Sequence, residues 1–389
     1  MYNYNFIWAF ALLLTTAYSQ EKDCNCMTAL NEVSEVIKSS KSYKDQVTTA
    51  NLRIELQEWR EQIKEEIKND SLSTFFCVGY IQKYISFIKD RHNEIYWVPE
   101  DIPVNIPSYS KNIDTTLTAS DSISGIYFAG SDKILVKKSA EVEWLGITLD
   151  SNSKAWTKGK IRLRIKKTSP KTFEIFEFYK NGLLFYQNTI SINEGRIHST
   201  FWNKEDNYFF NKNHAENFNY ISLNPSFDYV GIKTLSRTKA LMKEADKFYD
   251  ETLQKLEKEN LIIDLRNNGG GSLKQAKPLI KYVKRNSSLK TIYVVINFKT
   301  SSAAELAVLE LLEDNRTKLV GENSRGMLAY GYGNKAYKTT TSCMDYKITL
   351  STKHNKKAYA QYETKGLTPD VKLSNTTSWI EQIINIEEN

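Results

Sequence analysis

Two segments of this 389-residue sequence place glycines or a hydroxyl group directly after an apolar run and before a helical pattern. The first, residues 264–271, reads Asp-Leu-Arg-Asn-Asn-Gly-Gly-Gly. Glycines let the backbone turn sharply and expose N–H groups, which can bind a phosphate or the oxyanion of an acyl-transfer intermediate. The spacing fits neither the P-loop nor the dinucleotide-binding glycine pattern, and a plain tight turn would have the same sequence.

The second segment contains Ser302, which begins a predicted helix. Glu305 follows three residues later. A Ser-x-x-Glu spacing is a capping box and needs no catalytic explanation. A hydroxyl at a helix N-terminus, beside small alanines, is also accessible and lies in a positive field that stabilises developing negative charge. Taken alone, this pattern leaves both interpretations of Ser302 open: helix cap or nucleophile.

The order of these segments along the chain resembles that of one protease family. The Ser302 helix is followed by Val-Gly-Glu-Asn-Ser-Arg-Gly at 320–326 and by Tyr-Glu-Thr-Lys-Gly-Leu-Thr-Pro-Asp at 362–370. Over about residues 208–375, this order resembles the catalytic domain of tail-specific (carboxyl-terminal processing) serine proteases. The resemblance implies an α/β fold with the ββα-superhelix core that this family shares with Clp proteases and crotonases.

The resemblance also implies roles for individual residues. It makes Ser302 the nucleophile of an acyl-enzyme mechanism. It places the N–H groups of Gly269 or Gly270, together with that of Ala303, in the oxyanion hole. It implies no metal or organic cofactor.

A nucleophilic serine needs a proton acceptor, and here the sequence departs from the commonest branch of the family. Met327 stands where that branch has a catalytic lysine, and a thioether cannot take the proton. The resemblance is to the tricorn-core-like branch, which implies His92 as the general base and Glu363 as the carboxylate that orients it. Arg91 stands at the place of that branch's serine relay. The alternative for His92 is a solvated histidine at a helix end.

Three regions that differ in periodicity surround these residues. We expect residues 20–107 to form an N-terminal helical region, because apolar residues recur there at helical spacing. Short alternating segments predict an all-β module over residues 108–207. This module occupies the place of a PDZ domain, although the sequence has no obvious PDZ carboxylate-binding loop. Residues 208–389 form the predicted catalytic domain.

The N-terminus predicts export. Residues 1–19 resemble a signal peptide with an apolar core, although no Lys or Arg precedes that core. We expect the protein to be periplasmic or secreted, with no membrane span after cleavage. An oxidising compartment favours a disulfide from Cys24 or Cys26 to Cys77, and the sequence does not choose between them.

Composition narrows the functional classes. The net charge of +7 is spread over many lysines, which indicates a solvated surface and no nucleic-acid partner. Cysteine and histidine spacing does not predict a metal site. We therefore expect an exported serine endopeptidase that acts on polypeptides. Two alternatives remain open: a peptide-binding protein of the same fold that has lost turnover, and a crotonase-like acyl-CoA enzyme, which export disfavours.

Overall fold

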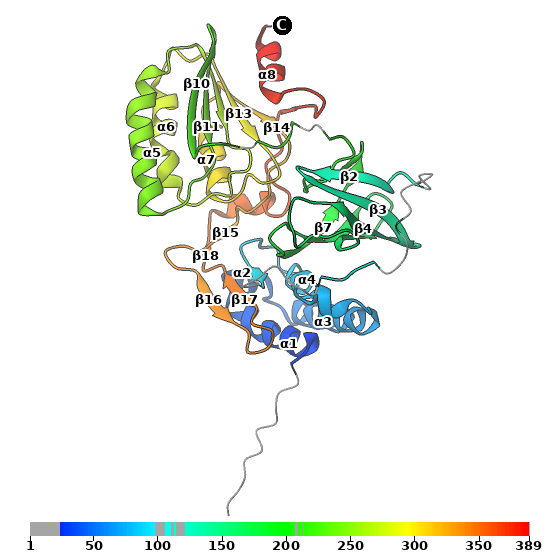
Figure 1. The fold of residues 1–389 in the computed structure, drawn as a ribbon. Coiled ribbons are helices and arrows are strands. Elements are labelled where there is room, and N and C mark those ends of the chain that lie inside the picture. Colours follow the sequence, from blue (N-terminus) through cyan, green and yellow to red (C-terminus); the bar gives the residue numbers. More distant parts are fainter. Residues whose placement is uncertain are drawn as a thin grey trace, which may run out of the picture.

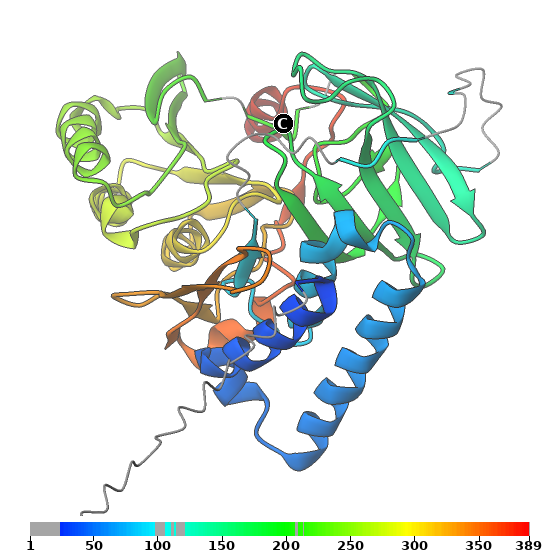
Figure 2. The same ribbon diagram turned by 60° about the horizontal axis from the view of Figure 1, so that its bottom comes forward.

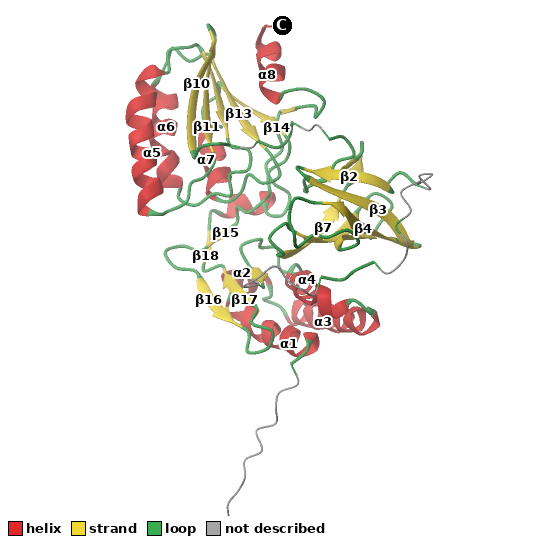
Figure 3. Cartoon of the chain, in the orientation of Figure 1, coloured by secondary structure: helices red, strands yellow, loops and turns green. Residues whose placement is uncertain are grey.

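The computed structural model describes residues 24–97, 106–109, 113, 121–206, 209–212 and 214–388. Figure 1 shows helices from the first part of the chain at the bottom, an antiparallel sheet beside them, and a sheet flanked by helices above. Figure 3 shows the same arrangement with helices and strands in different colours. The predicted signal peptide lies outside the described residues. Among the described residues, no helix combines the length and apolar character needed to cross a bilayer.

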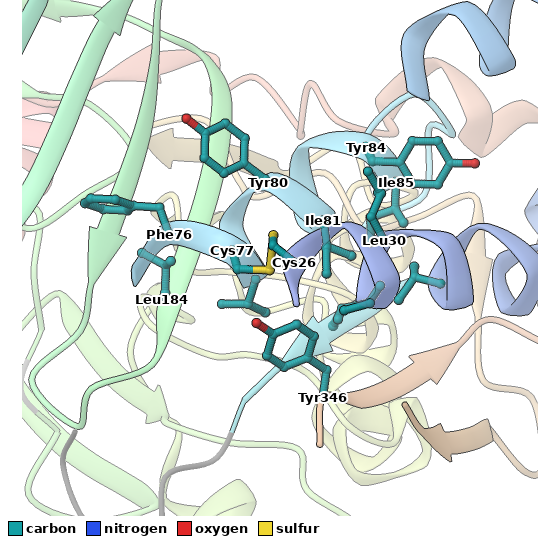
Figure 4. Close-up of a cluster of buried hydrophobic side chains, with 14 of the residues drawn as sticks. Cys26, Leu30, Phe76, Cys77, Tyr80, Ile81, Tyr84, Ile85, Leu184 and Tyr346 are labelled. Carbon is teal, nitrogen blue, oxygen red and sulfur yellow. A yellow bond between two sulfur atoms is a disulfide. The ribbon is translucent and has the colours of Figure 1, made fainter. Parts of the chain in front are cut away.

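The N-terminal region is helical, and three of its helices have a polar N-cap. The side chains of Asn25, Ser40 and Thr49 each accept a hydrogen bond from a backbone N–H of the first helical turn. Figure 4 shows how a disulfide between Cys26 and Cys77 joins the first and fourth of these helices in an apolar cluster. The helices are α1 (Cys26–Val36), η1 (Ile37–Ser39), α2 (Lys41–Gln46), α3 (Ala50–Asn69) and α4 (Ser73–Ile85).

The middle of the chain forms a six-stranded antiparallel sheet in the order β2-β3-β4-β5-β6-β7. Both of its faces are buried at β6, because Ile175 packs with the sheet's own apolar cluster and Phe176 packs with the N-terminal helices. Gly79 of α4 permits this close packing, since a Cβ there would lie 2.5 Å from the ring of Phe176. The strands are β2 (Gly125–Ala129), β3 (Asp132–Ala140), β4 (Glu143–Asp150), β5 (Ile161–Lys167), β6 (Phe173–Phe178) and β7 (Leu184–Ile190), followed by the two-stranded pair β8 (Ile192–Asn193) and β9 (Arg196–Ile197).

The last region contains a second six-stranded sheet, ordered β10-β11-β12-β13-β14-β19. β10 and β11 pair antiparallel, and all later neighbours pair parallel. Along β12, Leu261 and Ile263 pack with α5, α6 and α7, whereas Ile262 packs with α8. The elements are β10 (Phe218–Asn224), β11 (Phe227–Ile232), α5 (Lys239–Thr252), η2 (Leu253–Lys255), β12 (Asn260–Asp264), α6 (Leu273–Arg285), β13 (Thr291–Ile296), α7 (Ala303–Leu311), β14 (Thr317–Gly321), β19 (Val371–Lys372) and α8 (Trp379–Glu388).

A hairpin inserted between β14 and β19 returns to the N-terminal helices, as the rotated view in Figure 2 shows. It consists of β16 (Tyr337–Thr340) and β17 (Lys347–Leu350), and β17 pairs with β1 (Glu94–Tyr96). A second disulfide, Cys24–Cys343, joins this hairpin region to the start of α1. The remaining elements are β15 (Tyr330–Gly331), which pairs with β18 (Lys353–His354), and η3 (Lys357–Tyr362).

The predicted fold class is confirmed: an α/β core follows N-terminal helices and an all-β module. The sequence predicts that Cys77 pairs with Cys24 or Cys26, and its partner is Cys26. Cys24 pairs instead with Cys343, for which the sequence predicts no partner. The parallel strands β12 and β13 end side by side, so the two segments that follow them lie at one edge of the sheet.

Candidate active site

Ser302 lies at a sharp turn between β13 and α7. Its backbone has φ 55° and ψ −118°, a conformation that non-glycine residues rarely adopt and that costs about 1–3 kcal/mol. Two contacts hold the turn: the N–H of Ser301 donates to the carbonyl of Asn268 at 3.0 Å, and the N–H of Ser302 donates to Glu305 Oε2 at 2.8 Å. The hydroxyl is therefore presented at the start of a helix by a strained backbone that its neighbours maintain.

Glu305 does more than cap the helix. Its buried carboxylate also accepts hydrogen bonds from the N–H groups of Gly326 at 2.7 Å and Met327 at 2.9 Å, and from the hydroxyl of Ser324. Burial raises the pKa of Glu305, while these donors favour its charged form and oppose the rise. The acid predicted as part of a capping box thus ties the Ser302 turn to residues 324–327.

His92 reaches Ser302 from the N-terminal region. Its Nε2 lies 3.0 Å from Ser302 Oγ, and the two residues are separated by 210 positions in sequence. The backbone N–H of His92 donates to Asp90 Oδ1 at 2.8 Å, and the ring of Tyr332 contacts the imidazole edge-on at 5.2 Å between centroids. Burial, and next the positive charge of Arg325, lower the pKa of His92 to about 4. The imidazole is therefore neutral at pH 7 and can accept a proton.

The other ring nitrogen, Nδ1 of His92, is buried and has no hydrogen-bond partner among the described residues. The Asp90 carboxylate lies near it, with Oδ1 at 3.8 Å, which is longer than a hydrogen bond. The second oxygen of Asp90 accepts a hydrogen bond from the hydroxyl of Ser351. Asp90 was not singled out from the sequence, and only its position two residues before the histidine could have suggested it.

Glu363 is not hydrogen-bonded to the imidazole in the described part of the chain. Its Oε1 accepts from the backbone N–H of Arg91 at 2.9 Å, and its Oε2 accepts from those of Leu328 at 2.8 Å and Ala329 at 2.7 Å. Burial raises the pKa of Glu363 to about 7, against the effect of these donors. Glu363 therefore contacts the backbone just before His92. Among the described residues, the only hydrogen bond of the His92 ring is the one to Ser302.

The glycine turn after β12 packs directly against the Ser302 turn. A Cβ on Gly270, whose φ is 87°, would lie 2.6 Å from the carbonyl oxygen of Ser301 and 2.8 Å from the nitrogen of Ala303. The N–H of Gly270 donates to the Asn268 side chain at 2.9 Å, so it is already occupied. A Cβ on Gly269 would meet nothing within 4 Å. Among the described residues, no hydrogen bond engages the N–H of Gly269 or that of Ala303.

The two departures from the family pattern have structural roles. Arg91 donates from its guanidinium to the carbonyls of Arg325 at 2.7 Å and Thr364 at 3.2 Å, and burial lowers its pKa to about 10. Met327 is buried and contributes its backbone N–H to Glu305. Arg91 therefore joins the N-terminal region to the backbone at Arg325 and at Thr364.

Comparison with known proteins identifies one family over part of the chain. A family model described as peptidase family S41 matches residues 227–291, which include β11, β12, the glycine turn and α6. The predicted family resemblance is confirmed. The match to family S41 ends before Ser302, so the proposed nucleophile lies just outside it.

Several solved structures are similar to this chain. The photosystem II D1 C-terminal processing protease is 14% identical, with 90% of this chain and 93% of that chain covered and a TM-score of 0.35. Mature CPAF in complex with lactacystin is 12% identical, with 93% and 98% covered and a TM-score of 0.42. A lipoprotein from Streptococcus agalactiae is 17% identical, with 45% and 70% covered and a TM-score of 0.32. A search of curated proteins found no significant match.

Proposed function

We propose that this chain is an exported serine peptidase that hydrolyses peptide bonds through an acyl-enzyme at Ser302. The observation that carries the proposal is the 3.0 Å contact between His92 Nε2 and Ser302 Oγ at a strained turn. A serine and a neutral imidazole at this distance can exchange a proton without rearrangement. The S41 match over the adjacent glycine turn is consistent with this chemistry.

The proposed reaction uses groups already in place. His92 takes the proton of Ser302 as its Oγ attacks the peptide carbonyl, and the unoccupied N–H groups of Gly269 and Ala303 stabilise the oxyanion. The peptide C–N bond then breaks, and the imidazolium returns the proton to the leaving amine. A water molecule, deprotonated by the same imidazole, releases the acyl group. Gly270 serves the site through its close packing, because its own N–H is occupied.

Two carboxylates support His92 in this proposal. Glu363 acts as the orienting acid through the backbone, since it binds the N–H of Arg91. Asp90 faces Nδ1 at 3.8 Å and stabilises the imidazolium that forms when Ser302 loses its proton. Both are positioning residues, because neither touches the reacting atoms.

Two observations support export. Both disulfides close between segments far apart in sequence, and such bonds persist in oxidising compartments outside the cytosol. The apolar N-terminal stretch has the length of a signal-peptide core.

A serine-reactive fluorophosphonate tests the nucleophile. We expect it to label the wild-type protein and to leave the Ser302→Ala variant unlabelled, because the probe needs an activated hydroxyl. Ser287→Ala, at an exposed serine after α6, is the matched control and should be labelled like the wild type. A folded wild-type protein that the probe does not label would favour the inactive peptide-binding alternative.

A further inference from the structure

Two cationic side chains near Ser302, Lys299 and Arg325, form no ion pair with a carboxylate among the described residues. Lys299 precedes Ser302 by three residues, and Arg325 lies on the segment that Glu305 ties to the turn. The N–H of Arg325 donates to the carbonyl of Thr300 at 2.9 Å, so both cations belong to the immediate frame of the nucleophile. Both side chains are half-buried.

Neither cation is neutralised by a described residue. None of the described carboxylates lies within ion-pair distance of Lys299 or Arg325, and no described residue hydrogen-bonds the Arg325 guanidinium. Two other arginines near this sheet edge do form ion pairs: Arg196 binds Glu322 and Arg266 binds Asp264, each at 2.6 Å. Lys299 and Arg325 instead share with Arg91, whose guanidinium binds backbone carbonyls, the lack of a carboxylate partner among the described residues.

Lys299 is held in place by aromatic rings of the all-β module. Its ammonium lies over the ring of Tyr179 at 4.8 Å and that of Phe201 at 5.3 Å from the centroids. Burial, and next the like charge of Arg325, lower the pKa of Lys299 to about 8. The carboxyl of Glu177 also acts on Lys299, but burial raises the pKa of Glu177 to about 7 and leaves it only partly charged at neutral pH.

Uncompensated like charges raise the free energy of the unliganded protein, and an anionic ligand would remove that cost. A carboxylate suits the pair, because a guanidinium binds its two oxygens in a bidentate fork and an ammonium adds a third donor. Because the two cations lie near Ser302, a carboxylate that binds them would belong to the substrate and lie near the bond that is cleaved. We propose that Lys299 and Arg325 form a subsite for a carboxylate of the substrate, a proposal that rests on the proposed peptidase activity.

The carboxylate can come from an Asp or Glu side chain or from the free C-terminus of a peptide, and matched substrates distinguish these sources. The parent peptide is one that the wild-type protein cleaves from unfolded casein. Variants of it carry Glu or Gln at each of three positions on either side of the cleaved bond, and each is made with a C-terminal acid and a C-terminal amide. The readout is the ratio of kcat/KM between charged and neutral partners.

We expect one position to favour the charged partner by roughly tenfold to a hundredfold, the range for a charge-assisted hydrogen bond. Arg325→Gln and Lys299→Gln should each reduce that ratio toward one, and Arg325→Lys should restore part of it. Lys243→Gln, at an exposed lysine of α5, is the control and should keep the wild-type ratio. Equal rates for all charged and neutral pairs would overturn the proposal, as would a preference that persists in both Gln variants.

A binding measurement separates this proposal from the proposed function. Overlapping peptides that cover the casein sequence, made with Glu or Gln and with a C-terminal acid or amide and labelled with a fluorophore, are titrated with the Ser302→Ala protein, and affinity is measured by fluorescence anisotropy. If the wild-type protein cleaves nothing but the Ser302→Ala protein binds acidic peptides in an Arg325-dependent way, the peptidase assignment fails and the subsite stands. If cleavage occurs but neither rate nor affinity depends on the carboxylate, the subsite fails and the peptidase assignment stands.

Discussion

The Nε2 atom of His92 lies 3.0 Å from the Oγ atom of Ser302 at the junction of the N-terminal region and the α/β core. The contact depends on the turn between α4, which ends at Ile85, and β1, and on the elbow between β13 and α7. A buried carboxylate accepts a backbone N–H in each: Glu363 from Arg91 and Glu305 from Ser302. The proposed dyad is thus a property of the assembled chain.

Removing either member of the dyad should abolish turnover. Ser302→Ala cannot form the acyl-enzyme, and His92→Ala leaves the serine without a proton acceptor, so each should reduce kcat by on the order of 10³-fold or more. The two losses should not add in the double variant, since the residues act as one unit. A His92→Ala protein with near wild-type kcat would exclude His92 as the base.

Met327→Lys tests whether the chain is a decayed lysine-dyad enzyme. If His92 is the base, a lysine at this buried position should not raise kcat and should obstruct the site. Peptide cleavage is measured for both proteins under the same conditions. A wild-type protein without activity and an active Met327→Lys variant would contradict the assignment of His92.

The acidic limb of the pH–rate profile should lie well below pH 6.5. The base must be neutral to accept the proton, and the lowered pKa of His92 keeps it neutral down to about pH 4. Arg325→Gln should move this limb to higher pH, because it removes the charge that disfavours imidazolium. Protonation of Glu363, whose pKa is raised to about 7, would add a second limb near neutrality, which Glu363→Gln should eliminate. In the Glu363→Gln background, an acidic limb at pH 6.5 that Arg325→Gln does not move would contradict this account.

Asp90→Asn distinguishes the two supporting carboxylates. The change keeps the acceptor for the His92 backbone N–H but removes the charge that faces Nδ1, so kcat should fall by on the order of 10²-fold or more with little change in the melting temperature. Ser351→Ala, which removes only the donor to the far oxygen of Asp90, serves as the matched control and should cost much less. Equal effects of both changes would indicate a purely structural role for Asp90.

Gly270→Ala should damage the site by collision. Its Cβ would lie 2.6 Å from a backbone oxygen of the Ser302 turn, so we expect a lower melting temperature and loss of fluorophosphonate labelling. Gly130→Ala is a suitable control, because Gly130 also has a positive φ but its Cβ would meet nothing within 4 Å. The control isolates backbone strain, which costs about 1–2 kcal/mol. Similar behaviour of both variants would argue against close packing at Gly270.

Removing the Cys26–Cys77 disulfide should destabilise the N-terminal helices. The bond closes a loop with a sequence separation of 51 residues, for which the chain-entropy model gives about 4 kcal/mol. Unfolding in urea, compared between the wild type and a Cys26→Ser/Cys77→Ser double variant, measures the difference. An unchanged free energy of unfolding would show that the apolar cluster in Figure 4 holds these helices without the bond.

Local patterns in the sequence predicted the α/β fold class, because strand and helix periodicity and turn chemistry depend on neighbouring residues. The same patterns left Ser302 open as helix cap or nucleophile, and the resemblance to a protease family nominated Ser302 and His92. The partner of each buried group was decided by the tertiary structure. Glu363 binds the backbone before the histidine while Asp90 faces the ring. Such choices depend on differences of about an ångström between segments far apart in the chain, and hydrogen bonds are sensitive to that distance.

The same distinction applies to the cysteines and to the cations. Four cysteines allow three pairings, and only the return of the β16–β17 hairpin to α1 brings Cys343 to Cys24. The sequence does not show whether a lysine or an arginine has an ion-pair partner. Folding places Lys299 and Arg325 near one another without an ion pair among the described residues, because Glu322 is paired with Arg196 and Glu177 accepts a hydrogen bond from Trp202.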